Sequence, residues 1–252
     1  MKNYDDERSE KLLKLYSGAI TDIMDSISPD YRNQTLPSDL RPLTSNMKVA
    51  GPVYTVRGNK RFYDDGQDPR YKQMDMLDGI FPGCIIVMDS GDEKSAAHWG
   101  ELMSKTSMEK GAKGAIIHGG IRDTEEIIKH EFPVFACYHS PLTAVYRYNI
   151  IDFNNPIMIG EVKINPGDYV FGDIDGVVCS PHELKLAGNL LQDKIKITPG
   201  IRLSDSNSDD QSRVMNPVEA IDLGATYLVI GRPITSHKDK ASAFEKIYQS
   251  IY

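Results

Sequence analysis

The chain has 252 residues, 40% of them hydrophobic and 26% charged, which is ordinary globular composition and argues against long disorder. Its 29 lysines and arginines and 36 aspartates and glutamates give a net charge of −7, which disfavours nucleic acid and anionic membranes as partners. No apolar stretch approaches the roughly 18 residues of a membrane-spanning helix, and MKNYDDERSE lacks the apolar core of a signal peptide. Cys84, Cys137 and Cys179 lie far apart in apolar runs, which is typical of reduced thiols in a cytoplasmic protein.

Most of the chain predicts an alternation of strands and helices. Apolar residues between Leu12 and Ile27 recur at spacings near three to four and predict one helix, which Pro29 ends. The expected strands are 49–56 (with an internal Gly-Pro break), 84–88, 115–117, 134–138, 157–164 and 169–171. The expected helices are 74–80, 97–110 and 123–129, with a Gly119-Gly120 turn after the strand 115–117.

The order of predicted strands and helices changes after residue 175. Strands expected at 176–179, 194–198 and 227–230 alternate with helices at 181–191, 217–223 and 241–251. Such an alternation predicts parallel βαβ units with right-handed crossovers. The polar loop between Gly200 and Pro217 is long enough to be functional or mobile.

The chemistry is densest between Gly91 and Asp123. Arg122 and Asp123 follow a strand and a glycine pair, where an arginine fork suits a carboxylate or enolate and a carboxylate suits Mg²⁺. Upstream, the segment 100–103 would begin a helix, whose free N–H groups can hold an anion. Taken alone, an Arg-Asp pair is more often a surface salt bridge or a helix start.

Further motifs give this region a family resemblance. Glu101 and Arg122 are separated by twenty residues, and other matching stretches are 51–56, the Pro82-Gly83 strand, 111–114, 132–135 and 166–168. Over about residues 12–180 the chain resembles the RraA-like family, which includes the 4-hydroxy-4-methyl-2-oxoglutarate aldolases. The resemblance implies a trimer or a pair of trimers with sites at subunit interfaces.

The resemblance also implies site residues for a class II retro-aldol cleavage. Arg122 would bind the keto and enolate oxygens, and Asp123 would bind Mg²⁺ or Mn²⁺. The backbone amides of Gly100, Glu101, Leu102 and Met103 would hold the substrate carboxylate. Cleavage beside a ketone leaves an enolate, which a cation and a fixed arginine stabilise more than they stabilise the substrate. Oxaloacetate decarboxylation, which leaves the same enolate, is the expected side reaction.

One position departs from the aldolases, which carry aspartate where this chain has Glu101. The longer side chain could still act in catalysis by orienting water, but the substrate can differ. His98 and His118 flank the region, where packing is the commoner role for a histidine; Trp99 is expected in the core or in a subunit interface.

The C-terminal segment resembles a second family. Residues 175–183, 198–202, 209–214 and 231–235 follow the order and spacing of the last part of orotidine 5′-phosphate decarboxylase, a TIM barrel. Carried over, Gln211, Gly231 and Arg232 would bind a phosphate. The decarboxylase's Asp-x-Lys-x-x-Asp motif is missing: its one partial match, Asp92-Glu-Lys94, has Ala97 where the motif has its last aspartate, which argues against that reaction. The segment is either structural or retains phosphate binding.

Together these patterns predict an α/β protein, in which an RraA-like sandwich of the swivelling-domain type spans 1–174. A βαβαβα segment resembling the end of a TIM barrel spans 175–252. The expected function is a metal-dependent lyase that releases pyruvate from a 4-hydroxy-2-oxo acid. The alternatives are a non-catalytic regulator that binds a partner enzyme such as ribonuclease E, and a phosphate-binding protein. The expected setting is a cytoplasmic homo-oligomer with a small-molecule substrate.

Overall fold

The computed structural model describes residues 6–63, 66, 68–91, 93–180, 197–198, 216–222 and 227–251. The chain divides into two compact units, Met1–Lys185 and Leu186–Tyr252. Helices and strands are mixed in both units, so the predicted α/β class is confirmed. The division between 1–174 and 175–252 stays a prediction.

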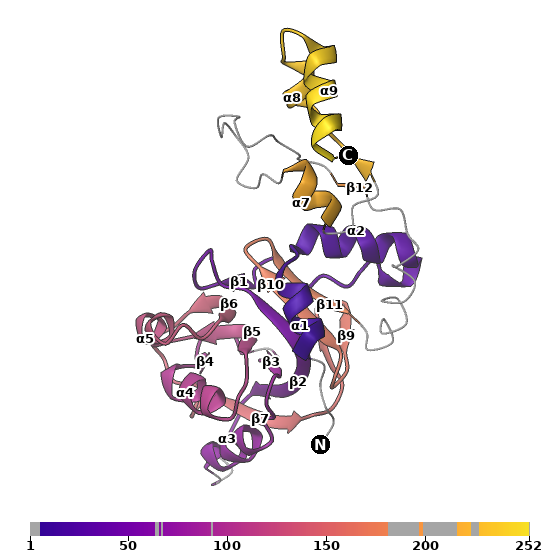
Figure 1. The fold of residues 1–252 in the computed structure, drawn as a ribbon. Coiled ribbons are helices and arrows are strands. Elements are labelled where there is room, and N and C mark those ends of the chain that lie inside the picture. The colour runs from indigo at the N-terminus through magenta and orange to yellow at the C-terminus, as the bar shows by residue number, and fades with distance from the viewer. Residues whose placement is uncertain are drawn as a thin grey trace. The chain divides into compact units, whose positions relative to one another are not determined.

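The first unit is built on one curled sheet. Its strands in spatial order are β1 (Arg41–Pro42), β6 (Val134–His139), β5 (Gly114–Ile121), β3 (Ile85–Asp89), β2 (Val49–Lys60), β10 (Tyr169–Asp173) and β11 (Gly176–Ser180). The short strand β4 (Ala97–Trp99) adds to β5, and β7 (Tyr148–Phe153) adds to β2. The sheet nearly closes (Figure 1), since Arg41 Nη1 of β1 donates a hydrogen bond of 2.7 Å to the carbonyl of Asp175, which precedes β11.

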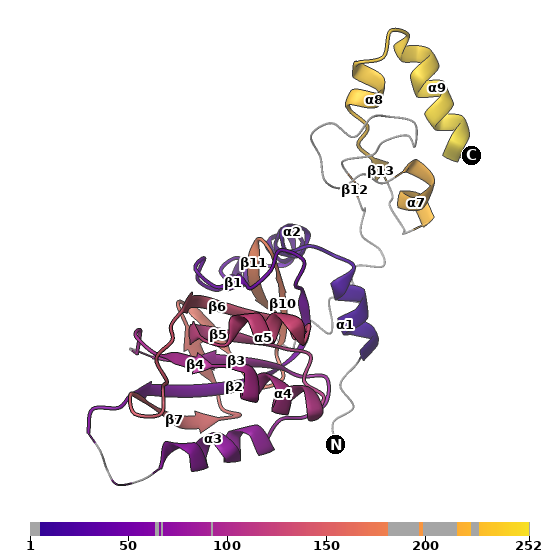
Figure 2. The same ribbon diagram turned by 90° about the vertical axis from the view of Figure 1, so that its left-hand side faces the viewer.

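Side chains alternate along the central strands and pack into two hydrophobic cores, one on each face of the sheet. Ile86 and Met88 pack under three helices, α3 (Pro69–Asp78), α4 (Glu101–Glu109) and α5 (Thr124–Lys129), all visible in Figure 2. Ile85 and Val87 face the other way and pack with the hairpin β8 (Ile157–Ile159) and β9 (Val162–Ile164). Strands β2, β3, β5 and β6 are parallel, so their carboxyl ends share one edge.

The prediction of a single first helix is wrong. The chain forms α1 (Asp6–Leu13) and α2 (Ser17–Ile27), followed by a short 3-10 helix at Pro29–Tyr31. Helix α2 starts anew because the buried Asp173 carboxylate accepts both the Ser17 N–H at 2.9 Å and the Ser17 hydroxyl at 2.8 Å. Its buried face, Ile20 and Met24, covers strands β10 and β11.

The predicted helix 97–110 is also wrong at its start. Ala97–Trp99 is strand β4, because it pairs with β5, and α4 begins only after the extended Gly100. Gly119 and Gly120 do not form a turn; they lie inside β5, where its pairing with β4 and β6 shifts register. The chain leaves the strand at Arg122.

Three further expectations change. Strand β2 runs unbroken through Gly51-Pro52 to Lys60, and residues 157–164 form a hairpin rather than one strand. Strand β11 is antiparallel to β10 instead of opening a parallel βαβ unit. Strands β1 and β7 were not predicted. Trp99 is 1% exposed and belongs to the core, in line with one of its two expected places.

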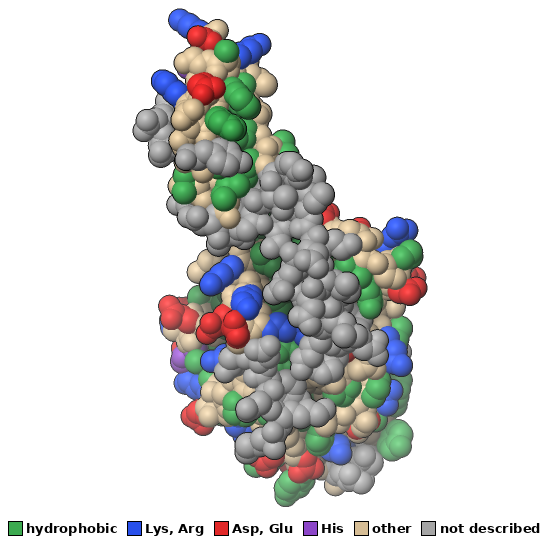
Figure 3. All heavy atoms as spheres, turned by 45° about the vertical axis from the view of Figure 1, so that its right-hand side comes forward, with side chains coloured by type: hydrophobic (Ala, Val, Ile, Leu, Met, Phe, Trp, Pro, Cys, Tyr) green, Lys and Arg blue, Asp and Glu red, His purple; other side chains and the backbone are tan. Residues whose placement is uncertain are grey.

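The second unit contains the parallel pair β12 (Ile197–Thr198) and β13 (Tyr227–Leu228), with α7 (Pro217–Asp222), α8 (Arg232–Thr235) and α9 (Lys240–Ile251). Ala243 and Ile247 are buried on α9, whereas Phe244 and Tyr248 stack on its exposed face. The predicted helix 181–191 lies outside the described residues. Over the part of the chain that the structure describes, no helix has the length and apolarity to cross a membrane. Basic and acidic side chains are interspersed on the face in Figure 3.

Candidate active site

The first residues of α4 and α5 meet at the carboxyl end of β5. Asp123 precedes α5, and its Oδ2 accepts the backbone N–H of Glu101, the first residue of α4, at 3.2 Å. Arg122 Nε lies 3.6 Å from the same oxygen. Both side chains are accessible, 44% for Arg122 and 41% for Asp123, so a ligand can reach them. The structure therefore brings the predicted Arg-Asp pair and the start of α4 together.

Gly100 makes this approach possible. A Cβ at this position would lie 2.7 Å from Asp123 Oδ2 and 3.4 Å from Arg122 Cγ, so any side chain would displace the aspartate. Asp123 itself has φ 58° and ψ 32°, the left-handed region that aspartate tolerates better than most residues. A strained residue at an accessible helix start is typical of a functional position.

The start of α4 offers N–H groups to an anion. Within the described residues, no hydrogen-bond acceptor contacts the N–H of Leu102 or Met103, as expected for the first turn of a helix. The Leu102 side chain is 76% exposed and the Met103 side chain is buried, so a substrate would use their backbone rather than their side chains.

The Glu101 carboxylate forms ion pairs with residues of α4 and the end of α5. Its Oε1 contacts Lys105 Nζ at 2.7 Å and His130 Nε2 at 3.3 Å, and these partners hold the pKa of Glu101 below its usual value. Oxygen and nitrogen atoms of Glu101, Glu126 and His130 lie within 4.8 Å of one another. Lys105 and Lys129 already balance the two carboxylates. This group is therefore an ion-pair network between α4 and α5.

The donor set at Asp123 fits a hard divalent cation. Mg²⁺ keeps several waters and is usually held by one or two carboxylates together with oxygens of the substrate. Asp123 supplies one exposed carboxylate, and no partner of its Oδ1 occurs among the described residues. Arg122 lies beside this carboxylate, with its Nε 3.6 Å from Asp123 Oδ2.

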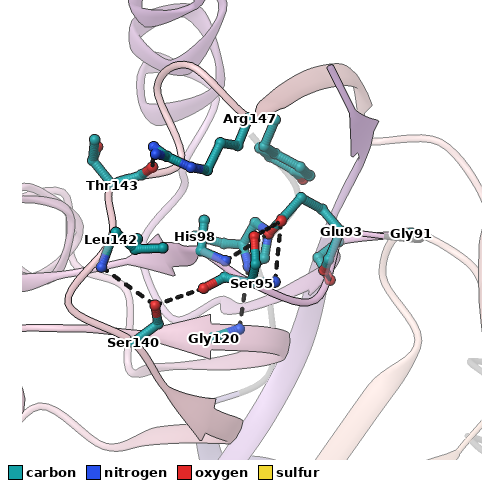
Figure 4. A network of polar contacts seen from close by, with 12 residues as sticks. Gly91, Glu93, Ser95, His98, Gly120, Ser140, Leu142, Thr143 and Arg147 are labelled. Carbon is teal, nitrogen blue, oxygen red and sulfur yellow. Dashed lines mark hydrogen bonds and ion pairs between the residues drawn. The ribbon is translucent and has the colours of Figure 1, made fainter. Parts of the chain in front are cut away.

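A buried glutamate that the sequence analysis missed lies behind the site. Glu93 Oε2 accepts the Ala96 N–H at 2.9 Å and lies 3.1 Å from His98 Nε2, with side-chain exposures of 3% and 0% for the two residues (Figure 4). Ser95 donates its N–H at 3.0 Å and its hydroxyl to Glu93 Oε1. The only signal was a glutamate in the charged loop before Ala97–Trp99, which is too common to single out.

The electrostatics of this pair are unusual. Burial lowers the pKa of His98 to about 4, against the opposing effect of Glu93. Burial would raise the pKa of Glu93, but hydrogen bonds from Ser95 and Ala96 outweigh it and hold that pKa below its usual value. The fold therefore favours a neutral His98 and an ionised Glu93. His118 instead contacts Asp89 Oδ1 at 3.0 Å and remains partly exposed.

The predicted phosphate residues are only partly covered by the structure. Gln211 lies outside the described residues. Gly231 immediately precedes α8, and its carbonyl accepts the N–H groups of Ile234 and Thr235 at 3.0 Å each. Arg232 is the first residue of α8. Phosphate binding by these three residues stays a prediction.

Comparison with known proteins gives two matches along the chain. The family model for orotidine 5′-phosphate decarboxylase and the HUMPS family matches residues 170–247. A decarboxylase from Staphylococcus saprophyticus is 49% identical over 78 residues, which cover 31% of this chain and 34% of that enzyme. The resemblance of the C-terminal segment is thus confirmed.

A second curated relative matches a longer part of the chain. Protein DlpA of Legionella pneumophila is 26% identical over 196 residues, which cover 78% of this chain and 30% of DlpA. The chain thus spans about a third of the length of these two curated relatives.

Solved structures match about three quarters of the chain. A crystal structure described as one of novel cellulases from gut-associated microbes is 32% identical, with a TM-score of 0.67 over 76% of this chain and 89% of the other. Streptomyces coelicolor RraAS2 shares the fold at 21% identity, with a TM-score of 0.64 over 75% of this chain and 93% of the other. The Aldolase/RraA model matches residues 20–179, and the chain belongs to this RraA-like family.

Proposed function

We propose that the protein is a divalent-metal-dependent lyase that cleaves a 4-hydroxy-2-oxo acid and releases pyruvate. The observation that carries the proposal is the convergence of Gly100, Arg122 and Asp123 on the first turn of α4. A cation ligand, a guanidinium and free N–H groups within one accessible site suit a dianionic 2-oxo acid.

Each part of the site has a separate task. The N–H groups at the start of α4 would bind the carboxylate next to the keto group, helped by the positive end of the helix dipole. Arg122 would donate to the keto oxygen, and its interaction would strengthen as negative charge develops there during C–C cleavage. Asp123 would hold Mg²⁺ or Mn²⁺, which would act as a Lewis acid on the substrate oxygens.

Glu101 is proposed to act beside this site rather than as a direct ligand. Its carboxylate is held by Lys105 and His130 and remains ionised at neutral pH, since its pKa is lowered. An ionised carboxylate at the rim can orient water and accept a proton from the 4-hydroxyl through that water. In the aldolases that it resembles, aspartate stands at this position.

The direct test is metal-dependent pyruvate release. Metal-stripped protein is titrated with Mg²⁺ and Mn²⁺ in the presence of 4-hydroxy-4-methyl-2-oxoglutarate, and pyruvate is measured by a coupled dehydrogenase. We expect saturable turnover that Arg122→Ala lowers by about 10²–10³-fold. Blanks without protein correct for metal-catalysed decay, which matters most when oxaloacetate is the second substrate.

The competing activity is that of a regulator. RraAS2 is described as an unusual member of the RNase ES inhibitor RraA protein family. A regulator of that kind needs neither Arg122 nor a metal, so ribonuclease inhibition without pyruvate release, unchanged by Arg122→Ala, would favour it. We also expect a trimer or hexamer and a cytoplasmic location, which light scattering and cell fractionation would test.

A further inference from the structure

Strand β4 is only three residues long, yet it carries the backbone that leads into the site. The Ala97 N–H donates to the Leu142 carbonyl at 2.8 Å, and the Trp99 carbonyl accepts the Arg122 N–H at 3.1 Å. Such a short strand needs further contacts to keep one position. The loop before it, with Glu93 at its centre, supplies them (Figure 4).

His98 connects this loop to β5. Its Nδ1 accepts the Gly120 N–H at 3.1 Å, so the proton of the neutral ring is on Nε2, which faces Glu93 Oε2 at 3.1 Å. The Gly120 hydrogen bond selects this tautomer, whereas Nε2 lies within ion-pair distance of Glu93 without the geometry of a hydrogen bond. The ring is also packed edge-on against Tyr148, with 4.7 Å between the ring centroids.

Gly119 and Gly120 in β5 leave no space for side chains next to the His98 ring and the backbone before it. A Cβ on Gly119 would lie 2.7 Å from His98 Nδ1, and a Cβ on Gly120 would lie 2.5 Å from the Ala96 carbonyl. The backbone of β5 at its register shift therefore packs closely against both His98 and Ala96. Arg122 is two residues further along, so a displacement at Gly120 would move it directly.

We propose that Glu93 and His98 are positioning residues that fix Gly120 and strand β4, and thereby hold Arg122 and Gly100 in the arrangement that the active site needs. Neither residue would touch substrate or metal. Only the kinetic consequences of this proposal rest on the proposed function. The positioning role itself can be tested by amide exchange, without any measurement of activity.

Two substitutions at His98 separate the contacts. In His98→Asn, the carboxamide oxygen can take the place of Nδ1 and accept the Gly120 N–H, but the side chain is too short to reach Glu93. In His98→Gln, the carboxamide reaches the place of Nε2 and can face Glu93, leaving Gly120 without an acceptor. Glu93→Gln serves as a second variant if His98→Gln fails to fold.

The matched control is Ser17→Ala. It also removes a buried side-chain hydrogen bond, the one from Ser17 to Asp173. That bond joins α2 to β10 and has no contact with the site. It should lower the melting temperature without changing kcat. Any loss that it shares with the His98 variants reports general destabilisation.

The first readout is hydrogen–deuterium exchange of the backbone amides of Gly120, Arg122 and Glu101, each relative to Ile86 in β3. We expect at least tenfold faster relative exchange at Gly120 and Arg122 in His98→Gln, and little change in His98→Asn or Ser17→Ala. Unchanged relative exchange in His98→Gln or Glu93→Gln would overturn the proposal, whether or not the protein proves to be a lyase.

The second readout is kinetic. A displacement of about 1 Å can cost roughly 10²-fold in rate, so kcat for pyruvate release should fall by that order in His98→Gln, with a smaller change in KM. His98→Asn should recover most of it. Equal losses in the two variants would contradict the proposed role of Gly120. A wild-type protein that releases no pyruvate would refute the proposed function, and the exchange result would then decide the positioning role alone.

Discussion

The Asp123 carboxylate lies 3.2 Å from the Glu101 backbone nitrogen, so the residue that precedes α5 binds the first N–H of α4. This single contact joins two helix starts that are 22 residues apart in the chain. It leaves the second carboxylate oxygen available to a cation. Changes on either side of the contact should therefore alter metal affinity and turnover together.

Substitutions of Arg122 should affect turnover more than substrate binding. Its guanidinium would strengthen its interaction as charge develops, so Arg122→Ala should lower kcat by about 10²–10³-fold. Arg122→Lys should retain a small residual rate, since an ammonium cannot reproduce the two-donor geometry. Steady-state kinetics with oxaloacetate measure both variants. Wild-type rates in Arg122→Ala would mean that the arginine only forms an exposed ion pair with Asp123, 3.6 Å away.

Gly100→Ala should weaken metal binding without unfolding the protein. The new methyl carbon would lie 2.7 Å from Asp123 Oδ2, so the carboxylate must move. We expect at least a tenfold weaker apparent affinity for Mg²⁺ in the pyruvate assay. Gly18→Ala in α2 is the control: its Cβ meets nothing closer than 3.5 Å, and alanine favours the helix by about 0.5–1 kcal/mol. Identical metal titrations for the two variants would place the cation away from Asp123.

Glu101→Gln tests whether the rim carboxylate takes part in proton transfer. It keeps the backbone N–H that binds Asp123 but removes the charge that faces Lys105 and His130. If Glu101 accepts a proton through water, kcat should fall by about 10²-fold. Glu125→Gln on α5, which loses only an exposed pair with Lys129, is the matched control and should keep its rate. Equal rates would leave Glu101 as a structural ion-pair partner only.

Acid should destabilise the fold through His98. Its pKa is about 4 in the folded protein, below the ordinary value of 6.5, so the fold favours the neutral ring. The associated stability is complete above about pH 6.5 and is lost as the pH falls towards 4, in total about 3 kcal/mol.

The groups packed around His98 set its pKa. Glu93 and Asp89 favour the charged ring, whereas burial beside Tyr148 opposes it, and Arg70 lines the same small cavity. Urea unfolding at pH 7, 5.5 and 4.5 should show a steeper loss of free energy in wild type than in His98→Asn. Parallel profiles for the two proteins would rule out His98 as the acid-sensitive group.

The sequence predicted where Arg122 and Asp123 lie in the fold, and it predicted much less about their surroundings. Arg122 and Asp123 follow a buried strand, and their position at a helix start could be predicted from that pattern. The strand β4 could not, because Ala97-His-Trp continues a helical pattern, and only pairing with β5 and the contacts of Glu93 make it extended. Likewise, the break between α1 and α2 depends on Asp173, which is 156 residues away from Ser17.

The orientation of Glu101 could not be predicted either. Spacing places it at the start of α4, but its carboxylate turns towards Lys105 one turn further along and towards His130 after α5. Only the packing of α4 beside α5 brings His130 within reach. A local pattern therefore predicts which residues lie at these helix starts, while long-range contacts decide where their side chains point.

The most direct test of the metal site compares wild type with Asp123→Asn, which keeps the shape of the side chain and removes its charge. Pyruvate release from 4-hydroxy-4-methyl-2-oxoglutarate is followed over a Mg²⁺ titration of metal-stripped protein, with circular dichroism to verify the fold. Saturable, Mg²⁺-dependent turnover in wild type and its loss in a folded Asp123→Asn protein is the predicted result. Turnover that is independent of metal, or equal in the two proteins, would contradict a lyase site at Asp123.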